Sequence, residues 1–111
     1  MEEARAVTQQ IPLEHFLVLS AILFSLGVYG VLTRRNAVLI LMSVELMLNA
    51  AAINMVAFAA YASPDALIGV IFAIFIITIA AAEAGLALAI ILRVFRNRGT
   101  ANVDEVNALR W

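Results

Sequence analysis

Residues 66–92 read ALIGVIFAIFIITIAAAEAGLALAIIL, with Glu83 as the one charged side chain. A helix of about 17–25 mainly apolar residues crosses the hydrocarbon core of a bilayer, so this run is long enough to do so. Two similar runs precede it: residues 16–33 carry no charge, and residues 36–64 carry only Glu45. The sequence therefore predicts an all-α membrane protein. Its three transmembrane helices are expected at about residues 14–33, 37–61 and 66–93.

The composition agrees with this fold class, because hydrophobic residues make up 65% of the 111-residue chain. A soluble domain of this length cannot bury so much apolar surface, so the excess must face lipid or apolar protein. The chain is also too short for a second folded domain. We divide it into an N-terminal extension at residues 1–13, a three-helix transmembrane domain at 14–95 and a cytoplasmic tail at 96–111.

Short polar segments at residues 33–36 and 61–65 separate the three runs, which predicts that neighbouring helices are antiparallel. Six of the seven arginines lie in the first segment or after the third run, at positions 34, 35, 93, 96, 98 and 110. The positive-inside rule then places the first loop and the tail in the cytoplasm, and the N-terminus outside, in the periplasm. Arg34 and Arg35 are interpreted first as topology anchors.

Glu45 and Glu83 are expected at similar depth in the membrane. Glu45 lies nine residues after Asn36 and Glu83 ten residues before Arg93, which puts them about 13 Å and about 15 Å from the same boundary. A charged side chain at such depth costs on the order of 3 kcal/mol, and desolvation can bring the pKa of a carboxyl close to neutral pH. Two such groups favour a proton relay. There are two alternatives. The carboxyls are permanently protonated and act as helix glue, which means that they hydrogen-bond neighbouring helices, or they pair with a basic residue of another subunit.

The neighbours of these acids suggest a polar seam inside a larger assembly. Asn49 lies one turn after Glu45 on the same helix face, where its amide can hydrogen-bond the carboxyl or a bridging water. Asn54 lies on the opposite face and is interpreted as helix glue. Alanines and Gly85 around Glu83 let other helices approach closely. Because three helices cannot enclose both acids, we expect obligate partner subunits.

The sequence excludes some redox chemistry on this chain. It has no cysteine and a single histidine, His15, so it cannot by itself hold a thiolate-ligated iron–sulfur cluster or a bis-histidine haem. Any electron transfer must take place in another subunit. The net charge of −1 gives no indication of a nucleic-acid partner, and none is expected.

Three segments resemble one known family: SVELMLNA at 43–50, AAAEA at 80–84 and NVDEVNALRW at 102–111. They are similar to subunit K of bacterial proton-pumping NADH:quinone oxidoreductase, respiratory complex I, over a region from about Ile11 onward. The resemblance implies a membrane-arm subunit in the bacterial inner membrane that contributes to proton translocation. Glu45 and Glu83 match the two family glutamates, which belong to a chain of carboxylates and lysines. This series of carboxylates and lysines links the quinone end of the complex to its antiporter-like subunits.

The resemblance also implies which groups lie elsewhere. This chain is expected to bind no cofactor, while FMN, iron–sulfur clusters and quinone are expected in partner subunits. Arg34 and Arg35 match the basic residues of the family's first loop. The electron donor, NADH or ferredoxin, stays open.

Other short membrane proteins fit less well. The C-type component of multisubunit Na+/H+ antiporters resembles the same family but lacks the paired glutamate motifs. A small multidrug exporter would need four spans with its carboxylate in the first, and an ATP synthase rotor protein would have two spans and one acid. A non-catalytic assembly subunit is the remaining alternative, because nothing in the chain performs bond chemistry.

Overall fold

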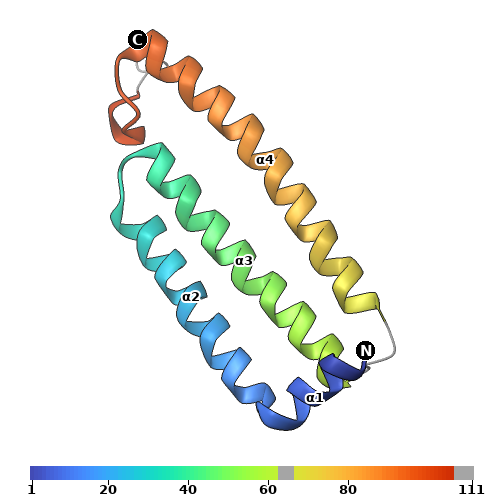
Figure 1. Cartoon of the computed structure of the whole chain (residues 1–111). Coiled ribbons are helices and arrows are strands. Elements are labelled where there is room, and N and C mark those ends of the chain that lie inside the picture. The colour runs from blue at the N-terminus through green and yellow to red at the C-terminus, as the bar shows by residue number, and fades with distance from the viewer. Residues whose placement is uncertain (63–66, 107–111) are drawn as a thin grey trace.

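The computed structural model of the chain describes residues 1–62 and 67–106, and their regular structure is helical (Figure 1). The elements are α1 (Glu2–Gln10), α2 (Leu13–Thr33), α3 (Ala37–Ala62), α4 (Ile68–Arg98) and the short 3-10 helix η1 (Val103–Glu105). Three of them, α2, α3 and α4, are long and apolar enough to cross a membrane. The three predicted spans are therefore confirmed.

Two helical segments lie outside the predicted spans. The third span was expected to end at about residue 93, but α4 continues to Arg98. Arginine is a good helix former, and the helix ends only where Gly99 adopts the left-handed conformation, with φ 70° and its N–H bonded to the Phe95 carbonyl. The N-terminal extension contains α1, whose first turn carries Glu2 and Glu3. Acidic side chains at that position interact favourably with the helix dipole.

The three long helices form a layer with α3 in the middle (Figure 1). Both α2 and α4 pack along α3, whereas α2 and α4 make only marginal contact with each other. The molecule is accordingly elongated, with principal extents of 61 × 23 × 18 Å. The helix α1 also contacts α3, near the C-terminal end of α3, and the described residues leave the rest of both broad faces of α3 without cover from a fourth helix.

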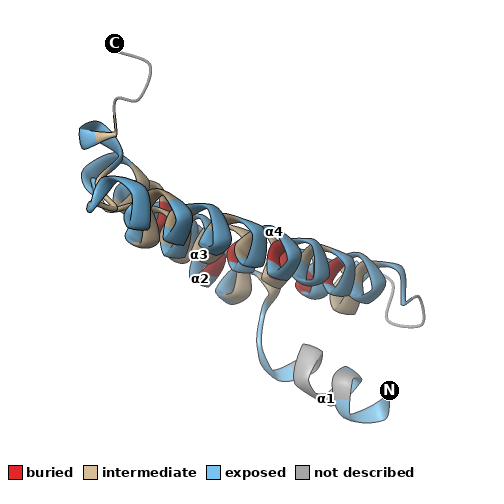
Figure 2. Ribbon diagram, turned by 90° about the horizontal axis from the view of Figure 1, so that it is seen from above, coloured by how far each residue is buried: buried red, intermediate tan, exposed pale blue. Residues whose placement is uncertain are grey.

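Burial is confined to small side chains on the helix-facing turns (Figure 2). The buried apolar residues are alanines, namely Ala50, Ala52, Ala57, Ala73 and Ala80. Most large apolar side chains of α2 and α4 are exposed, among them Phe24, Phe72 and Phe75. Such a surface must be covered by lipid or by neighbouring subunits.

A polar contact joins α2 to α3. The hydroxyl of Ser20, which is 2% exposed, lies 2.5 Å from Oδ1 of Asn54 and 3.0 Å from the Leu17 carbonyl oxygen. Its proton can be donated to either oxygen. This contact confirms the interpretation of Asn54 as helix glue.

Glycine allows α2 to approach α3 closely. A Cβ atom added to Gly27 would contact the Met47 side chain and lie 2.8 Å from the Ser43 carbonyl oxygen. Backbone atoms cannot move aside as a flexible side chain can. The helices therefore pack at a distance that only glycine permits at position 27.

Gly27→Ala should push α2 away from α3 and destabilise the subunit by about 1–3 kcal/mol, the usual cost of overpacking. We expect less assembled complex in the membrane and a lower midpoint of its thermal disassembly in detergent. Gly85→Ala is the matched control for packing within this subunit, since a Cβ there meets no atom of the described residues within 4 Å. Equal assembly of both variants would contradict the close α2–α3 packing.

Candidate proton-transfer site

Glu45 lies on α3 and lines a groove between α3 and α4. It is half-buried and follows Ala37, the first residue of α3, by eight residues, or about 12 Å of helix. The groove has a volume of about 450 Å³. Its polar lining side chains are Glu45 and Asn49; the others are Val38, Leu41, Met42, Leu46, Ala84 and Leu88.

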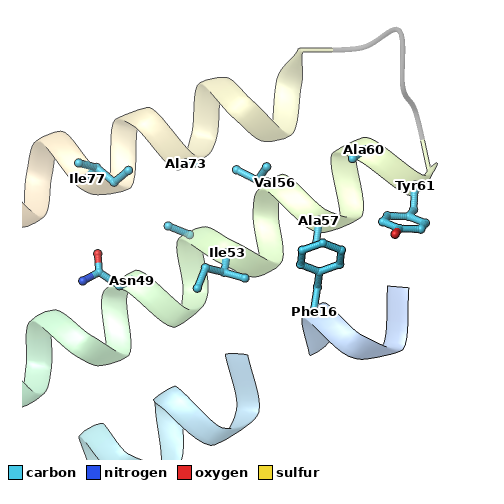
Figure 3. A pocket seen from close by; sticks show the side chains of 10 residues that line it. Phe16, Asn49, Ile53, Val56, Ala57, Ala60, Tyr61, Ala73 and Ile77 are labelled. Carbon is cyan, nitrogen blue, oxygen red and sulfur yellow. The ribbon is translucent and has the colours of Figure 1, made fainter. Parts of the chain in front are cut away.

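Asn49 also borders a larger groove of about 670 Å³ farther along the same helix (Figure 3). In this view the Asn49 side chain extends from α3 toward the space beside α4, which Ile77 also borders. Phe16 of α2 and Tyr61 of α3 close the far end, with their ring centroids 6.1 Å apart. The remaining lining residues are Ala52, Ile53, Val56, Ala57, Ala60 and Ala73.

The two grooves share Asn49 as a lining residue and follow one another along α3 as a line of grooves. Its lining begins at Val38 and ends at Tyr61, a span of about 35 Å at 1.5 Å per residue. This length matches the hydrocarbon core of a bilayer. Among its lining side chains the polar groups are Glu45, Asn49 and the hydroxyl of Tyr61, which donates a hydrogen bond to the Ile11 carbonyl at one end.

Glu83 lies beside the Glu45 turn but faces another direction. Ala84, the next residue, lines the Glu45 groove, so the two acid-bearing turns are neighbours across the α3–α4 seam. Glu83 itself is exposed and lines neither groove. The structure therefore brings the two helix turns together without placing both carboxyls in one groove.

The helix geometry gives the direction of Glu83. Ala80, 6% exposed, marks the buried side of α4, which packs on α3. At 100° per residue, Ile77 and Ala84 lie about 40–60° to one side of Ala80 and Glu83 about 60° to the other. Glu45 and Glu83 therefore open toward opposite broad faces of the layer.

Neither carboxyl has a partner within the part of the chain that the structure describes. The ion pairs there do not include Glu45 or Glu83, and no hydrogen bond reaches either side chain. Asn49 is exposed and equally without a hydrogen bond among these residues. Both acids thus present unpaired polar groups to whatever covers the layer.

Arg34 and Arg35 differ in their surroundings. Arg34 is exposed and caps α2, with its backbone N–H bonded to the Gly30 carbonyl. Arg35 Nε lies 3.3 Å from Oδ2 of Asp104, and its Nη2 lies 3.6 Å from Oε1 of Glu105. The structure therefore joins Arg35 to the tail and not to the membrane acids. The roles of Asp104 and Glu105 were missed from the sequence, although their acidic pair could have suggested a partner for the basic loop.

The comparisons with known proteins cover nearly the whole chain. Residues 15–111 match the family model of the NADH-ubiquinone/plastoquinone oxidoreductase chain 4L. NAD(P)H-quinone oxidoreductase subunit 4L of Leptolyngbya boryana is 52% identical over 99 residues, which are 89% of this chain and 98% of the relative. NADH-quinone oxidoreductase subunit K of a Geobacillus species is 51% identical over 100 residues, 90% of this chain and 96% of the relative. This chain belongs to the chain 4L family.

Family membership confirms the resemblance seen in the sequence. The chain 4L protein is a membrane subunit of an NADH-quinone oxidoreductase, and its partners are other subunits of that enzyme complex. With three helices able to span the bilayer it is a multi-pass membrane protein, and its likeness to the Geobacillus subunit supports the bacterial membrane expected from the sequence. The family match begins after α1.

Proposed function

We propose that this subunit relays protons through Glu45 and Glu83 within the membrane arm of a proton-pumping NADH:quinone oxidoreductase. One observation supports this most strongly. Two carboxyls lie on adjacent turns of neighbouring helices and open toward opposite faces of a layer that is one helix thick. A proton received on one face would then need to cross a single seam to reach the other.

The cost of burying charge explains why both faces need partners. An ionised carboxylate facing lipid at this depth would cost on the order of 3 kcal/mol or more. Other subunits supplying polar groups or water would lower that cost. We place the quinone-end subunits against one face and the antiporter-like subunits against the other, so that this chain forms a wall between them.

In this proposal the relay crosses the α3–α4 seam through water. Packed helix axes lie about 8–10 Å apart, which two carboxyls can bridge through one or two waters. Asn49 is suited to orient such a water on the Glu45 side, since its amide both donates and accepts hydrogen bonds. In this proposal the chain carries protons only, and FMN, iron–sulfur clusters and quinone lie in partner subunits.

Infrared difference spectroscopy of the intact complex tests the relay directly. On reduction, the carbonyl stretch of a protonated carboxyl should change, because each acid takes up or releases a proton during turnover. Glu45→Gln should remove one component of this signal and Glu83→Gln another. Glu14→Gln, at the first turn of α2, is the control that should leave both components in place. If the difference spectrum is the same with and without either variant, the two acids do not exchange protons during turnover. They would then only hydrogen-bond neighbouring helices in a scaffold subunit.

A further inference from the structure

The tail after α4 folds back onto the loop between α2 and α3 (Figure 1). The Ala37 N–H donates to the Ala101 carbonyl at 2.8 Å, and the Val103 N–H donates to the Arg35 carbonyl at 3.0 Å. Asn36 and Asn102 form an antiparallel β-bridge between these bonds. Three residues of the tail are thus paired with Arg35 and Asn36 of the loop and with Ala37, the first residue of α3.

Side chains reinforce this pairing. Arg35 holds both Asp104 and Glu105, and the Thr100 hydroxyl donates to the other oxygen of Glu105 at 2.7 Å. The hydrogen bond from Thr100, a further one from Asn102 and the charge of Arg35 together lower the pKa of the exposed Glu105 carboxyl. Glu105 therefore stays ionised over a wider pH range than a free glutamate, and its ion pair with Arg35 persists there.

Between the tail and the α3–α4 seam is a partly open apolar cavity of about 290 Å³, whose wall residues Ile90 and Val103 are 54% and 53% exposed. The tail contributes Ala101, Val103 and Val106 to its walls, α3 contributes Ala37, and α4 contributes Ile90, Ile91 and Val94. No polar side chain of residues 1–62 or 67–106 lines it. Walls of this kind offer water few hydrogen-bond partners, so they oppose a continuous water chain.

The cavity lies on the same stripe of α4 as Glu83. Ile90 and Val94 follow Glu83 by seven and eleven residues, which brings them within about 20° of its direction around the helix. Along the axis Ile90 is about 10 Å from Glu83. The tail therefore lies over the end of this stripe of α4, at half-buried Val94, while Ile90, which is nearer to Glu83, stays largely exposed.

We propose that residues 100–106 are a cap that keeps water at this end of the layer from reaching Glu83, and that Arg35 is the residue that positions the cap. This inference rests on the proposed relay, because a cap matters most where a membrane acid must exchange protons only with chosen partners. Arg34 has no such role. It has no ion-pair partner in the described part of the chain, although it is next to Arg35 in sequence.

Cysteine labelling in the assembled complex tests the cap. The chain has no native cysteine, so Val94→Cys gives a single thiol on this subunit inside the capped cavity. Arg35→Ala should raise its rate of labelling by a membrane-impermeant maleimide about two- to fivefold, the range expected for loss of exposed ion pairs. Val103→Pro should do the same, because proline lacks the N–H that bonds Arg35 but suits the first position of η1.

Two controls belong to this experiment. Arg34→Ala, an equal loss of charge at the neighbouring position, should leave the labelling of Val94→Cys unchanged, and Arg35→Lys should restore most of the protection. Leu92→Cys lies on the exposed side of α4 outside the cavity, and its labelling should not respond to the tail variants. Equal labelling of Val94→Cys with and without Arg35 would overturn the cap and leave the relay untouched.

A second measurement asks whether the cap protects Glu83. Vesicles containing the Arg35→Ala complex, with the enzyme at rest, should leak protons about two- to fivefold faster than vesicles containing the wild type. Adding Glu83→Gln should abolish that increase. A leak that persists without the carboxyl would overturn the proposal even if labelling rises. Pumping by the single Glu83→Gln variant tests the relay separately, so the two failures are distinguishable.

Discussion

Glu45→Gln is expected to reduce proton pumping per electron by at least about tenfold, which is less than the roughly 10²–10⁴-fold that a positioned acid–base group contributes to a reaction rate. Glutamine has nearly the size of glutamate and keeps a polar end in the groove beside Asn49, so packing should survive. It cannot take up or release a proton at neutral pH. The loss should therefore appear in pumping and not in assembly of the complex.

Reconstituted vesicles provide the measurement. The decay of a pH-sensitive dye signal on substrate addition gives pumping, and electron transfer to an artificial acceptor that bypasses the membrane arm gives the amount of intact enzyme. Glu45→Asp should be milder, since the acid survives with a shorter reach. Leu46→Met, beside it in the same groove, is the control for a change of lining without a change of acid. Undiminished pumping by Glu45→Gln would rule out its part in the relay.

Moving the second carboxyl by one residue should fail to preserve pumping. In the double variant Glu83→Ala, Ala84→Glu, the chain keeps two membrane acids, and α4 keeps its length and composition. Position 84 lines the Glu45 groove, whereas position 83 faces the other side of the layer. We expect a loss of at least about tenfold in pumping, similar to that of Glu83→Ala alone.

This exchange tests whether pumping requires the carboxyl to face a particular side of α4 or only to be present in that helix. Glu83→Asp keeps an acid on the original face and should pump better than the double variant. If the double variant pumps as well as the wild type, the two acids can work from a single groove, and opposite faces are not required. Electron transfer to the artificial acceptor shows whether position 84 tolerates the larger side chain.

The apolar runs were sufficient to predict the number, position and type of the long helices. Lengthy runs interrupted by Arg34–Asn36 and by Pro64 leave few alternatives in a bilayer, where every backbone group must be satisfied within a helix. Helical rise placed Glu45 and Glu83 near one depth, and the structure sets their turns side by side across the seam. The loop at Pro64 and the residue Trp111 lie outside the described residues. The number and position of the helices could be predicted because they depend on the pattern along each run and not on which helices pack beside it.

Which helix lies in the middle, and which way each acid faces, depends on packing between the helices. Nothing in the apolar runs indicated that α3 packs between α2 and α4, because apolar side chains occur on all sides of each helix. Polar side chains lie on opposite faces of α3, at Glu45 and at Asn54, so they indicate no single side of this helix that must face a neighbour. The opposite orientations of Glu45 and Glu83, and the pairing of Arg35 with the tail, arise from contacts between segments far apart in sequence. Close approach at Gly27 and the seam alanines fixes that packing.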